Sequence, residues 1–270
     1  MNNYVISLIS ATERREHVTK EFGKHTIPFQ FFDAITPNDL NRPDILELLP
    51  NIHQAKLSSG EKGCLLSHLA LWKKCIDENL PYINIFEDDI LLGENAKEFL
   101  FQDEWFFKRF DLKKNFILRF ETFLMPVKNE TTDIFPYKDR EFKILKEVHF
   151  GTAGYTIANQ TAKFLLEKVR NALDDKLAAI DELIFDHFLN ELPIYQISPA
   201  ICVQEMEFNK EKCYLYSQIQ EERKKIRESL TPKVERNLME KIFRELQRPF
   251  KKEKAKKLAK IREKYIILFK

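Results

Sequence analysis

Glycine and cysteine are both scarce in this sequence, and each shortage narrows the classes of protein that it can encode. Only 6 of the 270 residues are glycine while 23 are phenylalanine, so low-complexity tracts are not expected. The four cysteines have no C-x-x-C spacing; they are Cys64, Cys75, Cys202 and Cys213. Such spacing predicts reduced thiols of a cytoplasmic protein, and it argues against both a disulfide framework and a zinc site.

Long apolar runs are also missing. No stretch approaches the roughly 20 apolar residues that cross a bilayer, and residues 1–4 lack the basic region and the apolar core of a signal peptide. We therefore expect a cytoplasmic protein without a transmembrane helix. Apolar residues make up 44% of the chain and charged residues 32%, which is typical of a globular protein. The length suits one large domain, or one domain with an appendage.

Charge is distributed unevenly along the chain, although the formal net charge is only +2. Residues 220–270 contain 18 Lys or Arg and 8 Asp or Glu, a net charge of +10. Residues 1–219 contain 26 Lys or Arg and 34 Asp or Glu, a net charge of −8. An acidic body with a basic tail predicts that the tail meets an anionic surface.

A short apolar stretch that ends in three acidic residues is the most informative part of the sequence. Residues 82–86 are mostly β-branched or aromatic, which predicts a buried strand, and Glu87, Asp88 and Asp89 follow it directly. Carboxylates this close raise one another's pKa unless a cation neutralises them. Mg²⁺ and Mn²⁺ prefer oxygen ligands, and ligands of open α/β sheets bind at the carboxyl ends of strands. The alternative is a solvated acidic turn.

The N-terminal residues predict a strand, a turn and a helix. The strand covers residues 4–9 and the helix residues 12–22, with Ser10 as N-cap of a capping box closed by the glutamate three residues on. Arg14 and Arg15 fall in the first helical turn, where the macrodipole disfavours cations. They therefore indicate an anionic partner such as a diphosphate, unless they form only surface salt bridges with neighbouring glutamates.

A second helix is expected over residues 58–79, because its apolar positions recur with the helical period. Gly60 and Gly63 in its first turns would let another backbone or a ligand approach closely. His68 lies one turn further on, on the apolar face. A lone histidine in that position is more often a satisfied core residue than a functional one.

The remaining elements alternate between strands and helices, which predicts a doubly wound α/β fold. Strands are expected over residues 29–35, 115–120, 148–158 and 194–203, helices over 159–172 and 178–189, and an edge hairpin or loop over 130–143. Gly151 and Gly154 interrupt one strand, where they mark either a bulge or the approach of an extended sugar. Two basic amphipathic stretches follow, at residues 234–247 and 250–269.

Four segments together resemble the bacterial lipooligosaccharide glycosyltransferases of glycosyltransferase family 25. They are residues 5–8 with 13–17, residues 60–68 with Trp72, residues 85–90 and residues 151–157. The segments occur in the family's order between Tyr4 and about Val203. The run G-E-x-G-C-x-x-S-H is quite specific, whereas Glu-Asp-Asp alone is not.

The resemblance implies a GT-A type fold, that is, a Rossmann-like mixed sheet flanked by helices, over residues 1–212, with a basic helical extension over 213–270. It implies inverting transfer of a hexose, most often galactose, from a UDP-sugar to a lipooligosaccharide or lipopolysaccharide acceptor. It also implies Mn²⁺ or Mg²⁺ as cofactor, because the acidic motif replaces the family's metal-binding Asp-x-Asp.

Site residues are then expected at the matching positions. The metal ligands are Glu87, Asp88 and Asp89, and Glu87 is also placed at the catalytic centre. The donor-binding residues are Ser10, Arg14, Arg15, Gly63, Ser67 and His68. The acceptor-binding residues are Gly151, Thr152 and Tyr155. Asp181 matches the family's late acidic position and is the candidate general base; the alternative is a helix N-terminal carboxylate favoured by the dipole.

The basic tail carries an apolar strip formed by Leu258, Ile261, Tyr265, Ile266 and Leu268. A basic amphipathic helix suits an anionic inner-membrane surface, so we expect peripheral association there. The alternative is packing against the body or against a second subunit in a homodimer. Two other functions fit parts of the sequence. A carboxylate–metal phosphohydrolase would need a second set of carboxylates, which is not evident, and nucleic-acid binding is disfavoured by the acidic body.

Overall fold

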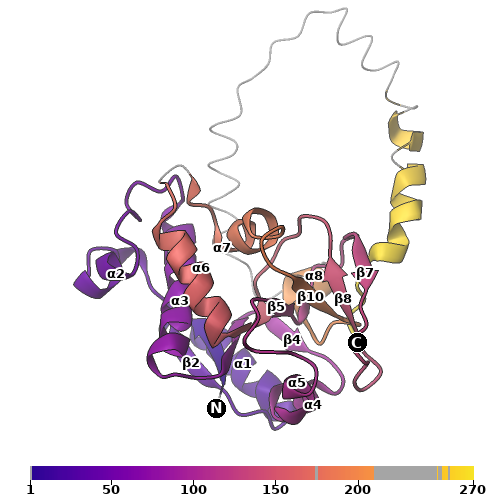
Figure 1. The fold of residues 1–270 in the computed structure, drawn as a ribbon, viewed down its shortest axis with the longest axis horizontal. Coiled ribbons are helices and arrows are strands. Elements are labelled where there is room, and N and C mark those ends of the chain that lie inside the picture. The colour runs from indigo at the N-terminus through magenta and orange to yellow at the C-terminus, as the bar shows by residue number, and fades with distance from the viewer. Residues whose placement is uncertain (1, 174–175, 210–247, 249–250, 255) are drawn as a thin grey trace, which may run out of the picture.

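The computed structural model describes residues 2–173, 176–209, 248, 251–254 and 256–270. These residues form one large sheet with helices on both faces and one small sheet beside it (Figure 1). The large sheet has the strand order β2 (Gln30–Asp33), β1 (Asn3–Ser7), β3 (Tyr82–Glu87), β9 (Gly154–Ala158), β5 (Ile117–Arg119), β10 (Ile194–Ser198), β8 (Glu141–Leu145) and β7 (Asn129–Thr131). The small sheet has the order β4 (Ile90–Leu92), β11 (Cys202–Gln204) and β6 (Glu121–Thr122).

Strand directions make the large sheet mixed. β1 is parallel to both β2 and β3, and β5 is parallel to β10. β9 is antiparallel to both of its neighbours, β3 and β5, and so separates the two parallel groups. The β7–β8 pair forms an antiparallel hairpin at the edge, as expected. The predicted mixed α/β fold is therefore confirmed.

Helices cover the two faces of the large sheet. The helical segments are α1 (Thr12–Lys24), η1 (Pro37–Asp39), α2 (Pro43–Leu48), α3 (Ser59–Asp77), α4 (Ala96–Leu100), α5 (Glu104–Phe107), α6 (Asn159–Arg170), α7 (Ile180–Glu182), the π-helical η3 (Leu183–His187), α8 (Glu205–Phe208) and η4 (Glu263–Tyr265). Figure 1 shows α3 and α6 side by side.

Alternation along the central strands supplies a separate core to each face. Ile83 and Ile85 of β3 join the apolar core under α2, α3, α6 and α7. Tyr82 and Phe86 of the same strand join an aromatic-rich core under α1, α4 and α5. A strand buried on both faces is nearly continuously apolar, and in residues 82–86 only Asn84 interrupts that pattern, which is why the strand is recognisable from the sequence.

The helices α1 and α3 begin differently. α3 has a capping box, in which Ser58 Oγ accepts from the Glu61 amide at 3.2 Å and the Ser58 amide donates to Glu61 Oε2 at 2.8 Å. The capping role of Ser10 was wrong. A turn from Leu8 to Ala11 precedes α1, so that Ala11 is the N-cap residue. Ser10 lies exposed in that turn, and α1 has no side-chain capping bond.

The expected strand pair over residues 194–203 also differs from the structure. β10 lies in the large sheet between β5 and β8, whereas β11 lies in the small sheet between β4 and β6. The chain between them therefore carries the backbone from one sheet to the other. The small sheet brings Gln204 and the start of α8 next to the acidic triplet, because the Glu205 amide donates to the Asp89 carbonyl at 2.8 Å.

The last six residues pack on the body of the protein. The Ala200 amide donates to the Leu268 carbonyl at 2.7 Å, the Lys270 amide returns a bond to the Ala200 carbonyl at 3.2 Å, and Ile267 is only 3% exposed. The buried Arg140 guanidinium also donates to the Lys270 carbonyl. The expected division into a body and an extension from residue 213 therefore does not hold for residues 265–270. The expected helix at 234–247 lies outside the described residues.

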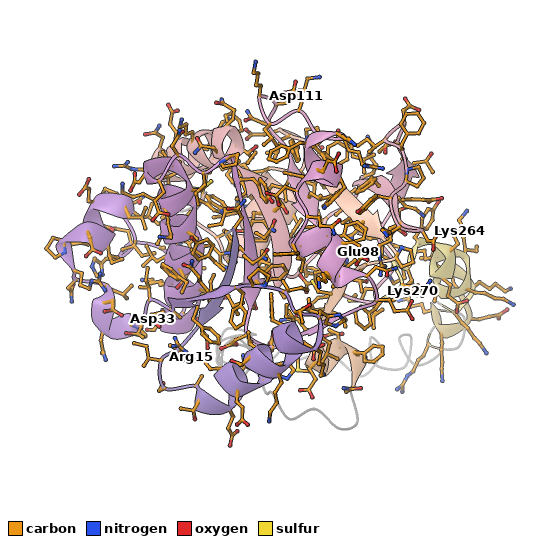
Figure 2. The ribbon with its side chains drawn as sticks, turned by 90° about the horizontal axis from the view of Figure 1, so that it is seen from below. Arg15, Asp33, Glu98, Asp111, Lys264 and Lys270 are labelled. Atoms are coloured by element: carbon orange, nitrogen blue, oxygen red, sulfur yellow. The ribbon has the colours of Figure 1, made fainter. Side chains whose placement is uncertain are left out.

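The helix formed by residues 251–254 and 256–262 has nearly all of its side chains in solvent. Seven of its residues are Lys or Arg and one is Glu, while Leu258 and Ile261 are 53% and 62% exposed. In Figure 2, Lys264 at its end lies on the opposite side of the molecule from Arg15 and Asp33. Within the described part of the chain, none of the helices has the length and apolar character needed to cross a membrane.

Candidate functional site

A cavity of about 290 Å³ opens where β1 and β3 end. Its walls come from the turn after β1, the start of α1, the loop after β2, the first turns of α3 and the acidic triplet after β3. This is the carboxyl end of parallel strands, where open α/β sheets bind ligands. A larger hollow of about 580 Å³ between α2, α3 and α6 contains none of the predicted site residues.

Arg14 crosses the mouth of the cavity to the acidic triplet. Its Nη1 atom lies 2.5 Å from Asp88 Oδ1 and 3.7 Å from Asp89 Oδ2. Burial lowers the pKa of Arg14, but the Asp89 and Asp88 carboxylates outweigh it and raise that pKa above its ordinary value. Burial raises the pKa of Asp89, and Arg14 opposes that change. One guanidinium therefore balances two carboxylates at the strand end, and these partners are neither the diphosphate expected for Arg14 nor the neighbouring glutamates of the alternative.

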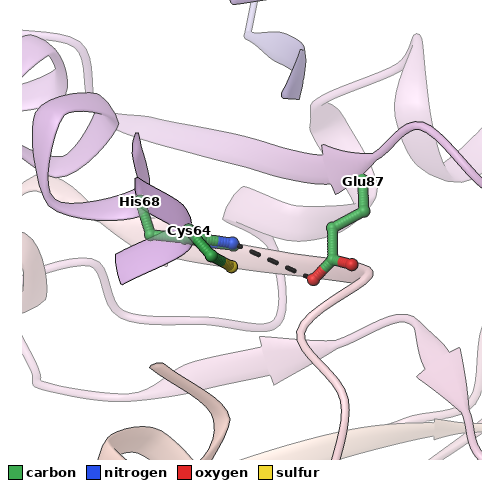
Figure 3. Close-up of side chains that lie close together, drawn as sticks. All are labelled: Cys64, His68 and Glu87. Carbon is green, nitrogen blue, oxygen red and sulfur yellow. Dashed lines mark ion pairs between the residues drawn. The ribbon is translucent and has the colours of Figure 1, made fainter. Parts of the chain in front are cut away.

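Glu87 points away from this group, toward α3 (Figure 3). Its Oε1 atom accepts from Thr152 Oγ1 at 2.9 Å and lies 4.0 Å from His68 Nε2. Burial raises the pKa of Glu87 well above its ordinary value, and the Asp89 and Glu121 carboxylates add to this effect. The structure thus divides the triplet. Asp88 and Asp89 face Arg14, whereas Glu87 faces the helix α3.

The first turns of α3 fit tightly against the loop after β2. Ser67 Oγ accepts from the Ile35 amide at 2.9 Å and donates to the Gly63 carbonyl at 2.7 Å. A side chain at Gly63 could not be accommodated, because a Cβ there would lie 2.4 Å from the Ile35 carbonyl oxygen. Both residues line the cavity, as expected, and both act by setting its shape.

His68 is completely buried at the base of the cavity. Its Nδ1 atom is hydrogen-bonded to the Tyr155 hydroxyl at 2.9 Å. The same hydroxyl accepts a hydrogen bond from Trp72 Nε1 at 2.9 Å. The Nε2 atom of His68 has no hydrogen-bond partner. Burial lowers the pKa of His68 to about 3, so the ring is neutral. Tyr155 is 0% exposed and supports His68 from behind, which does not fit the contact with an acceptor expected for it.

Two of the expected donor-binding residues lie outside the cavity. Arg15 donates from Nη2 to the Ser7 carbonyl at 3.0 Å and pairs with Asp33 Oδ1 at 2.5 Å, and its guanidinium stacks over the Phe31 ring. It therefore joins the ends of β1 and β2. Ser10 is exposed and does not line the cavity either. Neither residue fits the donor-binding role expected of it.

Comparisons with known proteins show the family of this chain. The family model described as "Glycosyltransferase family 25 (LPS biosynthesis protein)" matches residues 1–184. The chain is 40% identical to the lipooligosaccharide biosynthesis protein lex-1 of Haemophilus influenzae, over 97% of this chain and 96% of that protein. This chain belongs to glycosyltransferase family 25.

A second relative of this family 25 glycosyltransferase and one solved structure were also found. It is 38% identical to the lacto-N-neotetraose biosynthesis glycosyltransferase LgtE of Neisseria gonorrhoeae, over 100% of both chains. Among solved structures, it is similar to a glycosyltransferase involved in glycosylation of the major capsid of PBCV-1, with 9% identity, a TM-score of 0.37, and coverage of 76% of this chain and 94% of that one. The family membership decides against the phosphohydrolase and nucleic-acid alternatives.

The glycosyltransferase also has a buried ion pair that sequence reasoning missed. Arg119 and Glu121 are both 0% exposed, with Nη2 and Oε2 3.4 Å apart. Glu121 accepts from the Ala153 amide at 2.9 Å, and Arg119 donates to the Phe150 carbonyl. Burial raises the pKa of Glu121 to about 7 despite Arg119. The pair therefore holds the loop that carries Thr152 to Glu87.

Gly151 and Asp181, two further predicted residues, lie around this ion pair. Gly151 has φ +87°, and a Cβ there would lie 2.6 Å from Glu121 Oε1, so glycine is needed for both backbone conformation and space. Asp181 is 9% exposed at the start of α7, and its charge contributes to the pKa shifts of Glu87 and Arg119. Nothing in the local sequence around Glu121 distinguishes it from a strand-end glutamate on the surface.

Proposed function

We propose that this family 25 glycosyltransferase transfers galactose from UDP-galactose, with inversion at the anomeric carbon, to a lipooligosaccharide or lipopolysaccharide acceptor. The observation that supports this most is the Asp88–Asp89–Arg14 group at the carboxyl end of β3, within one cavity. Charged groups of both signs at a strand end suit a metal–diphosphate leaving group. The relatives named for lipooligosaccharide biosynthesis support the choice of acceptor.

The carboxylates present suit a hard divalent cation. Asp88 and Asp89 both approach the one Arg14 guanidinium, so their oxygens already converge on a positive charge. Mn²⁺ and Mg²⁺ prefer such oxygen donors, and we propose that Asp88 and Asp89 hold the ion of a GT-A type site. A bound ion would neutralise charge that develops on the departing diphosphate. Arg14 would then bind a phosphate oxygen of the donor.

Asp181 is proposed as the general base that takes the proton of the acceptor hydroxyl. It lies near Glu87 and the Arg119–Glu121 pair, on the side of the site where the Gly151–Thr152 loop passes. An inverting transfer needs a base on the face opposite the leaving group. Thr152, whose hydroxyl is bound to Glu87, is proposed to place the acceptor on that face, with Gly151 leaving its backbone accessible.

The donor assignment predicts a metal-dependent stabilisation by UDP. With UDP at about 100 times its Kd and Mn²⁺ present, unfolding should become about 2.7 kcal/mol less favourable, which raises Tm by roughly 5 to 10 °C. UDP without the metal should have little effect. A hydrolysis and transfer screen across UDP-galactose, UDP-glucose, UDP-N-acetylglucosamine and UDP-N-acetylgalactosamine should select the first. Absence of any UDP effect with Mn²⁺ would reject the donor class.

The exposed basic helix at residues 251–262 is proposed to hold the enzyme on the anionic cytoplasmic surface of the inner membrane, where a lipid-linked acceptor would be met. Each cation near such a surface contributes about 1 kcal/mol. Reversing three charges together, Lys256→Glu, Lys257→Glu and Lys260→Glu, should weaken binding to anionic vesicles by 100-fold or more. Donor hydrolysis should be nearly unchanged, because these residues lie outside the cavity.

The matched control reverses three exposed lysines of the body, Lys20, Lys108 and Lys113, and gives the same net charge. That control should retain most of the vesicle binding. Salt at roughly 0.5 M should release the unmodified protein, because the Debye length shortens. If the unmodified protein ignores anionic vesicles at low salt, or if the control loses binding equally, the helix is not the membrane contact.

A further inference from the structure

Cys64, His68 and Glu87 place a sulfur, a nitrogen and an oxygen atom close together at the base of the cavity (Figure 3). Their ligand atoms all lie within 4.8 Å of one another, and His68 Nε2 is 4.0 Å from Glu87 Oε1. Within the described part of the chain, no other such group of three has this geometry. We propose that these three side chains bind a divalent cation of the zinc type, at a site separate from the Asp88–Asp89 pair.

The surroundings of His68 are those of a metal ligand. Its Nε2 atom is buried, faces the other two residues and has no hydrogen-bond partner. A buried nitrogen left in this state costs free energy unless something binds it. Its other ring nitrogen, Nδ1, is hydrogen-bonded to the Tyr155 hydroxyl. Metal-binding histidines typically have such a bond on the nitrogen that faces away from the ion, because it fixes the ring and the tautomer.

The mixture of ligand atoms favours zinc over manganese or magnesium. Thiolate and imidazole are ligands for borderline and soft ions, whereas Mg²⁺ and Mn²⁺ prefer oxygen. Cys64 and His68 are four residues apart on α3 and so lie on one face of the helix. Tetrahedral bonds of 2.0 to 2.3 Å place ligand atoms about 3.3 to 3.8 Å apart. Small side-chain rotations would bring the three atoms to that spacing.

The site would have a free position for an exogenous ligand. Three protein ligands leave a fourth tetrahedral position open, as in zinc sites that bind water or substrate. All three residues line the cavity, so an ion can enter from solvent. Asp88 and Asp89, which face Arg14, remain available to a hard cation. The cavity would therefore offer two chemically different cation sites.

Zinc retention directly measures binding of the ion at Cys64, His68 and Glu87. The chelator-treated full-length protein is mixed with Zn²⁺, passed through a desalting column and assayed for metal. We expect one equivalent in the unmodified protein and in the Cys75→Ser control, and a loss of at least tenfold in affinity in Cys64→Ser. Asp89→Asn should retain zinc. Co²⁺ should give an intense sulfur-to-metal charge-transfer band in the unmodified protein and no such band in Cys64→Ser.

Thiol labelling gives a second measurement that does not depend on a variant folding correctly. Alkylation of each cysteine in the unmodified protein is scored by peptide mass mapping. Zn²⁺ should protect Cys64 from alkylation, and Mg²⁺ should not. Zinc retention that is equal in the unmodified and Cys64→Ser proteins, or alkylation of Cys64 that Zn²⁺ leaves unchanged, would overturn the proposal. Neither readout uses sugar transfer, so failure here is distinguishable from failure of the proposed activity.

Discussion

Replacing Asp88 or Asp89 by asparagine is expected to lower sugar transfer by at least about 100-fold, which corresponds to about 2.7 kcal/mol of lost transition-state stabilisation. Asparagine keeps the shape of the side chain but removes the charge that would hold a metal ion. The fold should persist, because burial already raises the pKa of Asp89 and so disfavours its charge. Asp89 also accepts a hydrogen bond from Gln204 Nε2 at 3.3 Å, which an amide oxygen can still accept.

The control for this pair is Asp111→Asn, the same chemical change at an exposed residue that does not line the cavity and lies on the side of the molecule opposite Arg15 and Asp33 (Figure 2). Transfer rates with UDP-galactose and Tm would be measured for all three variants. The control should match the unmodified enzyme in both. Near-normal transfer in both Asp88→Asn and Asp89→Asn would show that these carboxylates hold no catalytic metal, and a collapse of Tm would show that they are structural.

Ile267→Ala is expected to destabilise the protein by about 3 kcal/mol, a typical cost for removing a buried isoleucine side chain. For a chain of this size, that lowers Tm by roughly 6 to 12 °C. The cause is that Ile267 is 3% exposed and belongs to the core under α3 and α6, although it lies close to the end of the sequence. Its carbonyl also accepts from Thr122 Oγ1, which anchors the segment to the strand β6.

Leu268→Ala is the matched control, because the neighbouring side chain is 63% exposed. Its effect should stay within about 0.5 kcal/mol, as for most surface substitutions. Thermal or urea unfolding of the two variants would be compared with the unmodified protein. Equal and small effects would mean that residues 265–270 do not belong to the stable body in solution.

Much of the fold was predictable because the signals are local. The apolar run of β3 and the helical period of α3 each depend on neighbouring residues, and both elements form where the sequence indicates. The insertion of antiparallel β9 between β3 and β5 depends on pairing across more than 30 residues. Ile267 was overlooked because only its neighbours belong to the apolar strip, and its burial is set by a distant part of the chain.

The candidate site was predictable to a similar extent. Arg14 and Arg15 carried the same local signal, yet only Arg14 reaches Asp88 and Asp89, whereas Arg15 pairs with Asp33. The rotation of α1 about its axis decides between them, and packing on the sheet sets that rotation. Cys64 and His68 have a helical spacing of four, but the contribution of Glu87 comes from a strand 19 residues further on. No C-x-x-C pattern could therefore have revealed the group.

The contact between Gly63 and the Ile35 carbonyl has a consequence for how substrate preference can change during evolution. Helix α3 and the loop after β2 form two walls of the cavity, and main-chain atoms set the spacing between them because Gly63 has no Cβ. In the function proposed above, recognition of the substrate depends instead on side chains such as Arg14 and Thr152. Selection can therefore exchange the groups that recognise a sugar or an acceptor without altering the size of the molecule that the cavity admits.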